Sequence, residues 1–212
     1  ERKIRDYVAR LERSMLGTVD AISHMLDLRD PYTAGHELRV GELAAAIGRE
    51  LGLDETSCQG LNIIGRVHDI GKITVPAEIL SKPGRLTELE MNIVRTHAQQ
   101  GYEILRGIEF DWPVAEVIRQ HHERLDGSGY PLGLAGEAIM LEARIIAVAD
   151  VVESMASHRP YRPARGVAAA LAEIEAQSGV LYDPRVVEAC TRLFREQGFA
   201  FAAREQAPGT TD

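Results

Sequence analysis

The sequence predicts an all-α fold of about eight helices around one core. Apolar residues recur at steps of three and four along most of the 212 residues, and no alternating strand pattern of useful length is present. The composition, 45% apolar and 26% charged, is that of an ordinary globular domain. A chain of this length buries about 70% of its extended surface, so we expect it to fold without cross-links.

The charge balance argues against a nucleic-acid polymer as partner. The chain has 24 Lys and Arg against 32 Asp and Glu, a net charge of −8, whereas nucleic-acid phosphates require a basic footprint. The two cysteines, Cys58 and Cys190, are too few for a disulfide framework. We expect buried free thiols and a cytoplasmic location. No apolar run is long enough to span a bilayer, and the start at Glu1 suggests a fragment of a longer protein.

Residues 1–28 predict one long helix ahead of the main domain. Its apolar residues follow helical steps and are Ile4, Val8, Leu11, Met15, Val19, Ile22 and Leu26. Two interpretations stay open for this stripe. It packs on the domain, or its beginning pairs with a second copy of the chain. We assign residues 29–200 to the main domain and 201–212 to a flexible tail.

The helices of the first half of the domain have recognisable ends. Pro31 breaks the first helix because it disfavours helical geometry in the preceding residue. Asp54 is a good N-cap, and Thr87 to Glu90 has the form of a capping box. The predicted helices are 36–51, 54–69, one turn at 77–80, 87–105 and 112–122.

The second half begins with a glycine-rich loop. Residues 123–139 hold four glycines and a proline, and long loops in compact domains tend to be functional. Three helices are predicted after it, at 141–157, 166–177 and 184–196. Asp183 and Pro184 form an N-cap followed by proline at the first helical position.

Histidine and carboxylate residues recur at the predicted helix ends. Alone, each is more simply explained as a structural residue. Asp150, however, lies within a strongly apolar helix, where a carboxylate is costly unless it is paired or bound to metal. Imidazole and carboxylate without thiolate suit a catalytic Mn, Fe, Ni or Zn site. Six such groups are too many for one ion but suffice for two ions that share a carboxylate.

Two motifs make the sequence similar to a known family. Residues 68–72, HDIGK, resemble the signature of the HD metal-dependent phosphohydrolases, and residues 121–131, HHERLDGSGYP, resemble that of their HD-GYP subfamily. The first motif is weak evidence, whereas the second is very specific. With shorter matches elsewhere, the resemblance covers roughly residues 29–195 and implies an HD-domain helical bundle with a Gly-rich GYP loop.

The resemblance implies a bacterial phosphodiesterase that hydrolyses the second messenger cyclic di-GMP to pGpG or GMP, with a hydroxide bridging two divalent metal ions. The first ion would be held by His36, His68, Asp69 and Asp150. The second would be held by His97, His121, His122 and again Asp69, which would bridge the two. Asp69 and Lys72 would be the catalytic residues.

The substrate contacts come from the same resemblance. Lys72 would contact the scissile phosphate, Arg159 and Arg162 would grip phosphates, and Tyr130 would contact the substrate or a partner protein. The loop would be ordered by Asp126, Gly127, Gly129 and Pro131. A diguanylate cyclase domain is an expected partner of this loop, and the first helix is an expected homodimer contact.

Two positions depart from the family pattern. Some members have a glutamate that adds a third metal ion where this chain has Tyr32, which favours two ions. Glu153 replaces an aspartate, and its longer side chain is expected to alter how a metal-bound water or guanine is held. Two other functions stay open: a cyclic di-GMP receptor or docking module with little turnover, and a hydrolase of a related cyclic dinucleotide.

Overall fold

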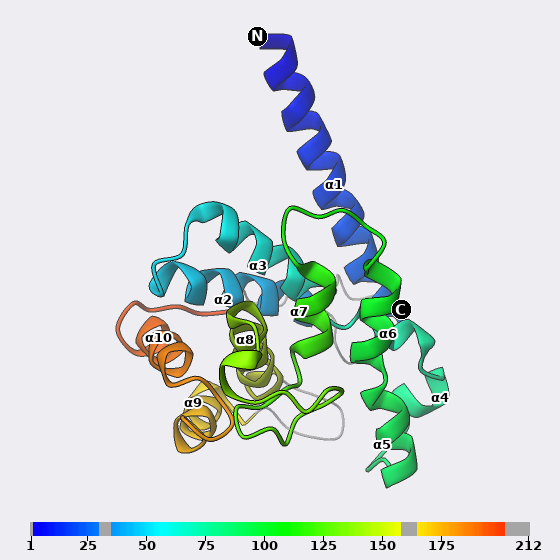
Figure 1. The fold of residues 1–212 in the computed structure, drawn as a ribbon, viewed down its shortest axis with the longest axis vertical. Coiled ribbons are helices and arrows are strands. Elements are labelled where there is room, and N and C mark those ends of the chain that lie inside the picture. The colour runs from blue at the N-terminus through cyan, green and yellow to red at the C-terminus, as the bar shows by residue number, and fades with distance from the viewer. Residues whose placement is uncertain (1, 30–34, 158–164, 202–212) are drawn as a thin grey trace, which may run out of the picture.

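The computed structural model describes residues 2–29, 35–157 and 165–201, and these form a helical bundle (Figure 1). No strand occurs within these ranges, so the all-α prediction is confirmed. The α-helices are α1 (Arg2–Arg29), α2 (His36–Glu50), α3 (Glu55–Val67), α4 (Ala77–Leu80), α5 (Glu88–Arg95), α6 (His97–Leu105), α7 (Val114–Gln120), α8 (Leu141–Ala156), α9 (Val167–Ala176) and α10 (Pro184–Arg195). Two short 3₁₀ helices are η1 (Ile70–Thr74) and η2 (Gly136–Ala138).

The helix expected at 87–105 is divided in two at Thr96. The Thr96 hydroxyl donates to the carbonyl of Ile93 at 2.7 Å, and Nδ1 of His97 lies 2.6 Å from the carbonyl of Val94. Side chains therefore engage two carbonyls that a continuous helix would use for its backbone. The predicted caps are present, because Asp54 accepts from the amide of Ser57 and Thr87 forms a capping box.

Two close backbone contacts bring helix ends together. A side chain at Gly65 of α3 would lie 2.5 Å from the Cα of Gly41 in α2, so these helices cross at a distance that only glycine permits. A side chain at Gly71 of η1 would lie 1.9 Å from the carbonyl oxygen of His97. These contacts place the start of α2 beside the end of α3, and η1 against the start of α6.

Helix α1 divides into a packed half and a projecting half (Figure 1). Val19 and Leu26 are buried where α1 packs on α3 and η1. Ile4, Tyr7 and Leu11 are more than half exposed on the part that extends away from the bundle. The second half of the stripe therefore packs on the domain, and pairing of the first half with a second copy stays a prediction. Within the described residues, no helix is both long and apolar enough to cross a membrane.

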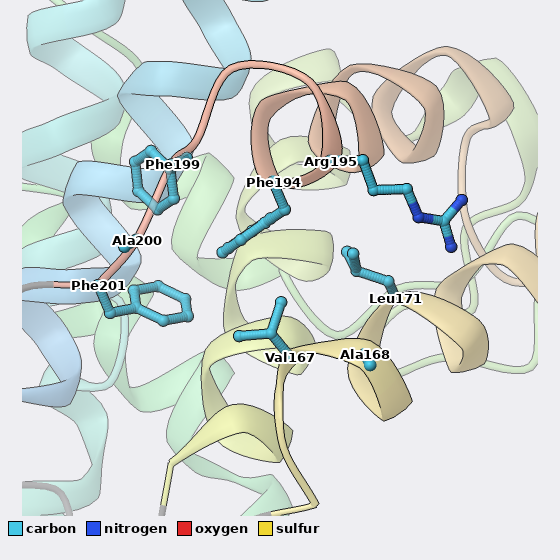
Figure 2. A pocket seen from close by; sticks show the side chains of 8 residues that line it. All are labelled: Val167, Ala168, Leu171, Phe194, Arg195, Phe199, Ala200 and Phe201. Carbon is cyan, nitrogen blue, oxygen red and sulfur yellow. The ribbon is translucent and has the colours of Figure 1, made fainter.

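The C-terminal edge carries a small apolar pocket (Figure 2). Phe194 of α10 and Phe199 and Phe201 of the following segment pack around it, opposite Val167 and Leu171 of α9. Its volume is about 520 Å³. None of its lining residues belongs to the predicted histidine and carboxylate set, so this pocket is not the predicted site. Elsewhere, Cys58 and Cys190 are buried free thiols, as expected.

Candidate metal centre

The seven side chains predicted as metal ligands converge at one place in the bundle. They come from the ends of four helices and from the middle of α8, so the bundle has to close before they meet. Most are almost fully buried, with 0% of His68 and His121 and 3% of Asp69 exposed. The seven are His36, His68, Asp69, His97, His121, His122 and Asp150.

One group of ligands surrounds Asp150. Its Oδ1 lies 3.3 Å from Nε2 of His36 and 3.9 Å from Nε2 of His68. Oδ2 of Asp69 lies 3.7 Å from the same nitrogen of His68. Two imidazoles and two carboxylates therefore face one point, which we call the first position.

The other group is a trio of histidines. Nε2 of His97 lies 3.3 Å from Nε2 of His121 and 3.1 Å from Nε2 of His122. Oδ1 of Asp69 lies 3.3 Å from the same atom of His97. The trio faces a second position, and Asp69 directs one oxygen toward each position.

Backbone carbonyls hold three of the rings in a defined orientation. Nδ1 of His68 lies 2.7 Å from the carbonyl three residues earlier, and the corresponding distances are 2.6 Å for His97 and 2.5 Å for His121. A carbonyl accepts only from a protonated nitrogen, so in the neutral form of each ring Nε2 is the unprotonated nitrogen. Each neutral ring therefore presents a lone pair to the centre, as a metal-binding imidazole does.

The arrangement fits divalent cations. Nε2 of His68 is buried without a hydrogen-bond partner among the described residues, and a buried polar atom of this kind is costly unless something binds it. Ligand atoms of His97, His121 and His122 lie within 4.8 Å of one another, and so do ligand atoms of His36, Glu37, His68 and Asp69. The donors are imidazole nitrogens and carboxylate oxygens without thiolate, which suits Mn, Fe, Ni or Zn.

The electrostatics of the first position favour positive charge. Burial disfavours a protonated imidazole, but hydrogen bonds to Asp150 and Glu153 outweigh it and raise the pKa of His36 to about 9. The charge of Glu37 contributes most to raising the pKa of His68 to about 10 against the same burial. In the absence of metal, His36 and His68 are therefore protonated near pH 7, because the surrounding carboxylates stabilise a positive charge on them.

The second position has the opposite character. Burial, together with the charge of His68, lowers the pKa of His121 to about 3. Burial and neighbouring imidazoles also lower the pKa of His122 well below its usual value, and that of His97 is lowered mainly by burial. These three rings are neutral near pH 7 and present unprotonated nitrogens to a cation.

Lys72 lies at the site but forms an ion pair within it. Its ammonium contacts Oδ2 of Asp69, and its side chain is 17% exposed. Burial alone would raise the pKa of Asp69, but Lys72 and the nearby histidines hold it well below its ordinary value. Lys72 therefore keeps Asp69 ionised and places a positive charge beside both positions.

The loop after His122 is closed by a residue that the sequence prediction missed. Glu123 is buried and accepts from the amides of Leu132 at 2.7 Å and Leu134 at 2.9 Å. The closed loop holds the ring of Tyr130 stacked on His122, with centroids 4.7 Å apart. The sequence signal that could have identified Glu123 is its place as the glutamate of the HHE triplet at residues 121–123.

The residues predicted to order the loop act locally, and Gly129 packs against the backbone of His122 and Glu123. Oδ1 of Asp126 accepts from the amide and the hydroxyl of Ser128. Gly127 has a φ of 80°, which favours glycine, and a side chain at Gly129 would lie 2.4 Å from the Cα of Glu123. Pro131 follows a cis peptide bond.

Two more carboxylates lie behind the ligands of the first position. Glu153 contacts Nδ1 of His36 and pairs with Arg39 at 2.6 Å, so it lies on the far side of the ring from Asp150. This placement differs from the expected role beside a bound water or guanine. Glu37, which follows His36 in the sequence, was missed altogether. Tyr32, Arg159 and Arg162 lie outside the described residues.

The comparisons with known proteins agree with this fold. The HD domain family model matches residues 20–186, and the chain belongs to this family. It is 42% identical over 194 residues to the cyclic di-GMP phosphodiesterase response regulator RpfG of Xanthomonas campestris, covering 91% of this chain and 51% of that protein. Over 141 residues it is 43% identical to 3'3'-cGAMP-specific phosphodiesterase 1 of Vibrio cholerae, covering 66% and 33%.

The solved structures extend the comparison to the fold. The chain matches a HDG"Y"P protein from Bdellovibrio bacteriovorus with a TM-score of 0.61 and 18% identity, over 76% of this chain and 51% of that one. The expected HD-domain bundle is thereby confirmed. The chain spans about half the length of RpfG, so the activity of a whole protein does not transfer by similarity alone.

Proposed function

We propose that this chain is the catalytic domain of a metal-dependent phosphodiesterase that hydrolyses cyclic di-GMP to pGpG or GMP. The observation that carries the proposal is the placement of Asp69, which directs one oxygen toward each of two groups of buried imidazoles. RpfG, which shares 42% of its aligned residues with the chain, is named as a phosphodiesterase of this substrate.

In this proposal the chain holds two divalent ions. The first position uses His36, His68 and Asp150, the second uses the trio of His97, His121 and His122, and Asp69 serves both. Paired divalent ions lower the pKa of water and stabilise negative charge on a phosphoryl group. Fe, Mn, Ni and Zn are all compatible with these donors.

The remaining groups orient the substrate. Lys72 places its ammonium beside Asp69, where it attracts a non-bridging phosphate oxygen. Tyr130 is fixed on His122 by stacking, and the guanidinium of Arg95 lies 5.6 Å from its ring centroid. This aromatic surface beside the second position suits a purine base.

A related cyclic dinucleotide is the second candidate substrate. The Vibrio cholerae relative is named as specific for 3'3'-cGAMP, and its aligned part is as similar to this chain as RpfG is. The ligand set does not distinguish these substrates, because it addresses the phosphodiester they share.

The test is a product assay on metal-loaded protein under reducing conditions. Protein loaded with Mn²⁺ or Fe²⁺ is incubated with cyclic di-GMP and, separately, with 3'3'-cGAMP, and the products are separated by chromatography. We expect linear dinucleotide or mononucleotide from the wild type and none from Asp69→Asn. Absence of turnover with both substrates refutes the function, and tight binding without turnover supports the receptor alternative. One metal ion per chain at full activity refutes the two-ion arrangement.

Two partner contacts extend the proposal. The exposed apolar residues on the projecting half of α1, Ile4, Tyr7 and Leu11, suit pairing with a second copy of the chain. Leu11→Glu should then shift a dimer to a monomer in light scattering. The loop at 123–139 remains the expected contact for a diguanylate cyclase domain, and the cytoplasmic location stays a prediction.

A further inference from the structure

We propose that Glu37 is a positioning residue that orients His68 and strengthens metal binding at the first position only. The inference rests on the two-ion arrangement of the proposed function. Glu37 is the second residue of α2 and only 2% of it is exposed. A carboxylate is rarely buried to this degree unless a partner compensates its charge.

The partner is the imidazole of His68. Oε2 of Glu37 lies 2.9 Å from Nδ1 of His68 and forms an ion pair with it, but Oε2 has no hydrogen-bond partner among the described residues. The hydrogen bond of Nδ1 goes to the carbonyl of Gly65 at 2.7 Å, so Glu37 acts on the ring through its charge. Nε2 of the same ring faces Asp69 and Asp150. Glu37 therefore lies behind the ring, where it acts through His68 and does not replace a ligand.

Glu37 differs from Glu153 and Asp69 in how its negative charge is compensated. Arg39 neutralises Glu153, and Lys72 pairs with Asp69. In the part of the chain that the structure describes, the ion pairs of Glu37 and Asp150 are with imidazole rings. These two carboxylates are compensated fully when a divalent cation lies between the rings and Asp150. A carboxylate behind a ligating histidine also makes the ring a stronger donor.

At the second position, neutral carbonyls and not carboxylates lie behind two of the histidine rings. Nδ1 of His97 and Nδ1 of His121 face the neutral carbonyls of Val94 and Ile118. Removing the charge of Glu37 should therefore weaken one position and leave the other unchanged. A general loss of structure would weaken both.

The experiment measures Mn²⁺ binding in two backgrounds. His97→Ala removes a ligand of the second position, and Asp150→Ala removes a ligand of the first. Metal-free protein of each background, with and without Glu37→Gln, is titrated with Mn²⁺, and free Mn²⁺ is counted by electron paramagnetic resonance. We expect Glu37→Gln to raise the Kd about 10- to 100-fold in the His97→Ala background, and to leave it unchanged in the Asp150→Ala background.

The controls separate this inference from folding and from the proposed function. Glu42→Gln removes a charge from the same helix outside the ligand set and should leave both values unchanged. Circular dichroism checks the fold, and Glu37→Asp, which withdraws the carboxylate by one methylene, replaces Glu37→Gln if the latter does not fold. An unchanged Kd in the His97→Ala background, or equal losses in both backgrounds, overturns the inference. Because no nucleotide is present, a failed phosphodiesterase assay does not affect the result.

Discussion

Glu123→Gln should loosen the loop at 123–139 while the bundle stays folded. The carboxylate accepts from the backbone amides of Leu132 and Leu134, at 2.7 and 2.9 Å. An amide side chain has one oxygen, so one backbone donor would then face an NH₂ group. A hydrogen bond to a charged group contributes about 1.5–3 kcal/mol, and about 1.4 kcal/mol is a tenfold change in an equilibrium. The free energy of opening the loop should fall by that amount.

Hydrogen exchange at these two amides measures the effect. Exchange at Leu132 or Leu134 should accelerate about 10- to 100-fold, while amides in α8 keep their protection. Because the loop holds Tyr130 on His122, KM for the dinucleotide should rise more than kcat falls. Glu103→Gln, at an exposed carboxylate of α6, is the matched control and should change neither quantity. Unchanged exchange at both loop amides would refute the role assigned to Glu123.

Three further predictions concern the centre and its support. Asp69→Asn removes the carboxylate shared by both positions, so metal content measured by mass spectrometry should fall and turnover should drop by more than about 100-fold; full activity would contradict the bridging role. Gly71→Ala places a methyl group 1.9 Å from the carbonyl oxygen of His97 and should destabilise the protein by about 3 kcal/mol. This corresponds to a fall in Tm of about 6–12 °C. Gly107 has open space around it, so Gly107→Ala is the control and should have little effect. In metal-free protein, His36 and His68 have pKa values raised to about 9 and 10, so the stability they contribute is complete below about pH 6.5 and is lost as pH rises through these values. The Tm of chelator-treated protein should therefore fall between about pH 7 and 10, and a constant Tm there would contradict the assignment.

The sequence predicted most of the helices and the seven histidine and aspartate side chains that the structure brings together, whose role as metal ligands stays a prediction. The starts of helices with a clear cap were predicted well, because Asp54 and Thr87 specify their own local geometry. The break at Thr96 was missed because apolar periodicity continues across it. It follows from two side chains that bind carbonyls, and one of them belongs to His97, whose position is set by the trio.

The residues behind the ligands were harder to predict than the ligands. Glu37 and Glu153 are ordinary helical glutamates by pattern, and a glutamate on a helix usually faces solvent. Their burial depends on how α2 packs against α3 and α8, which neither local sequence nor spacing reveals. The short carboxylate of Asp150 was identifiable because its neighbours along the chain are themselves apolar.

Because the ligands come from separate helices, metal supply should affect the amount of folded protein in the cell. Ions held at both positions would tie together α2, α3, α6, α7 and α8, and unfolding would have to release them. At a free metal concentration 100 times its Kd, each ion would add about 2.7 kcal/mol to the free energy of unfolding. Metal scarcity would then reduce the amount of folded chain as well as its activity, because the open state is the form that proteases degrade.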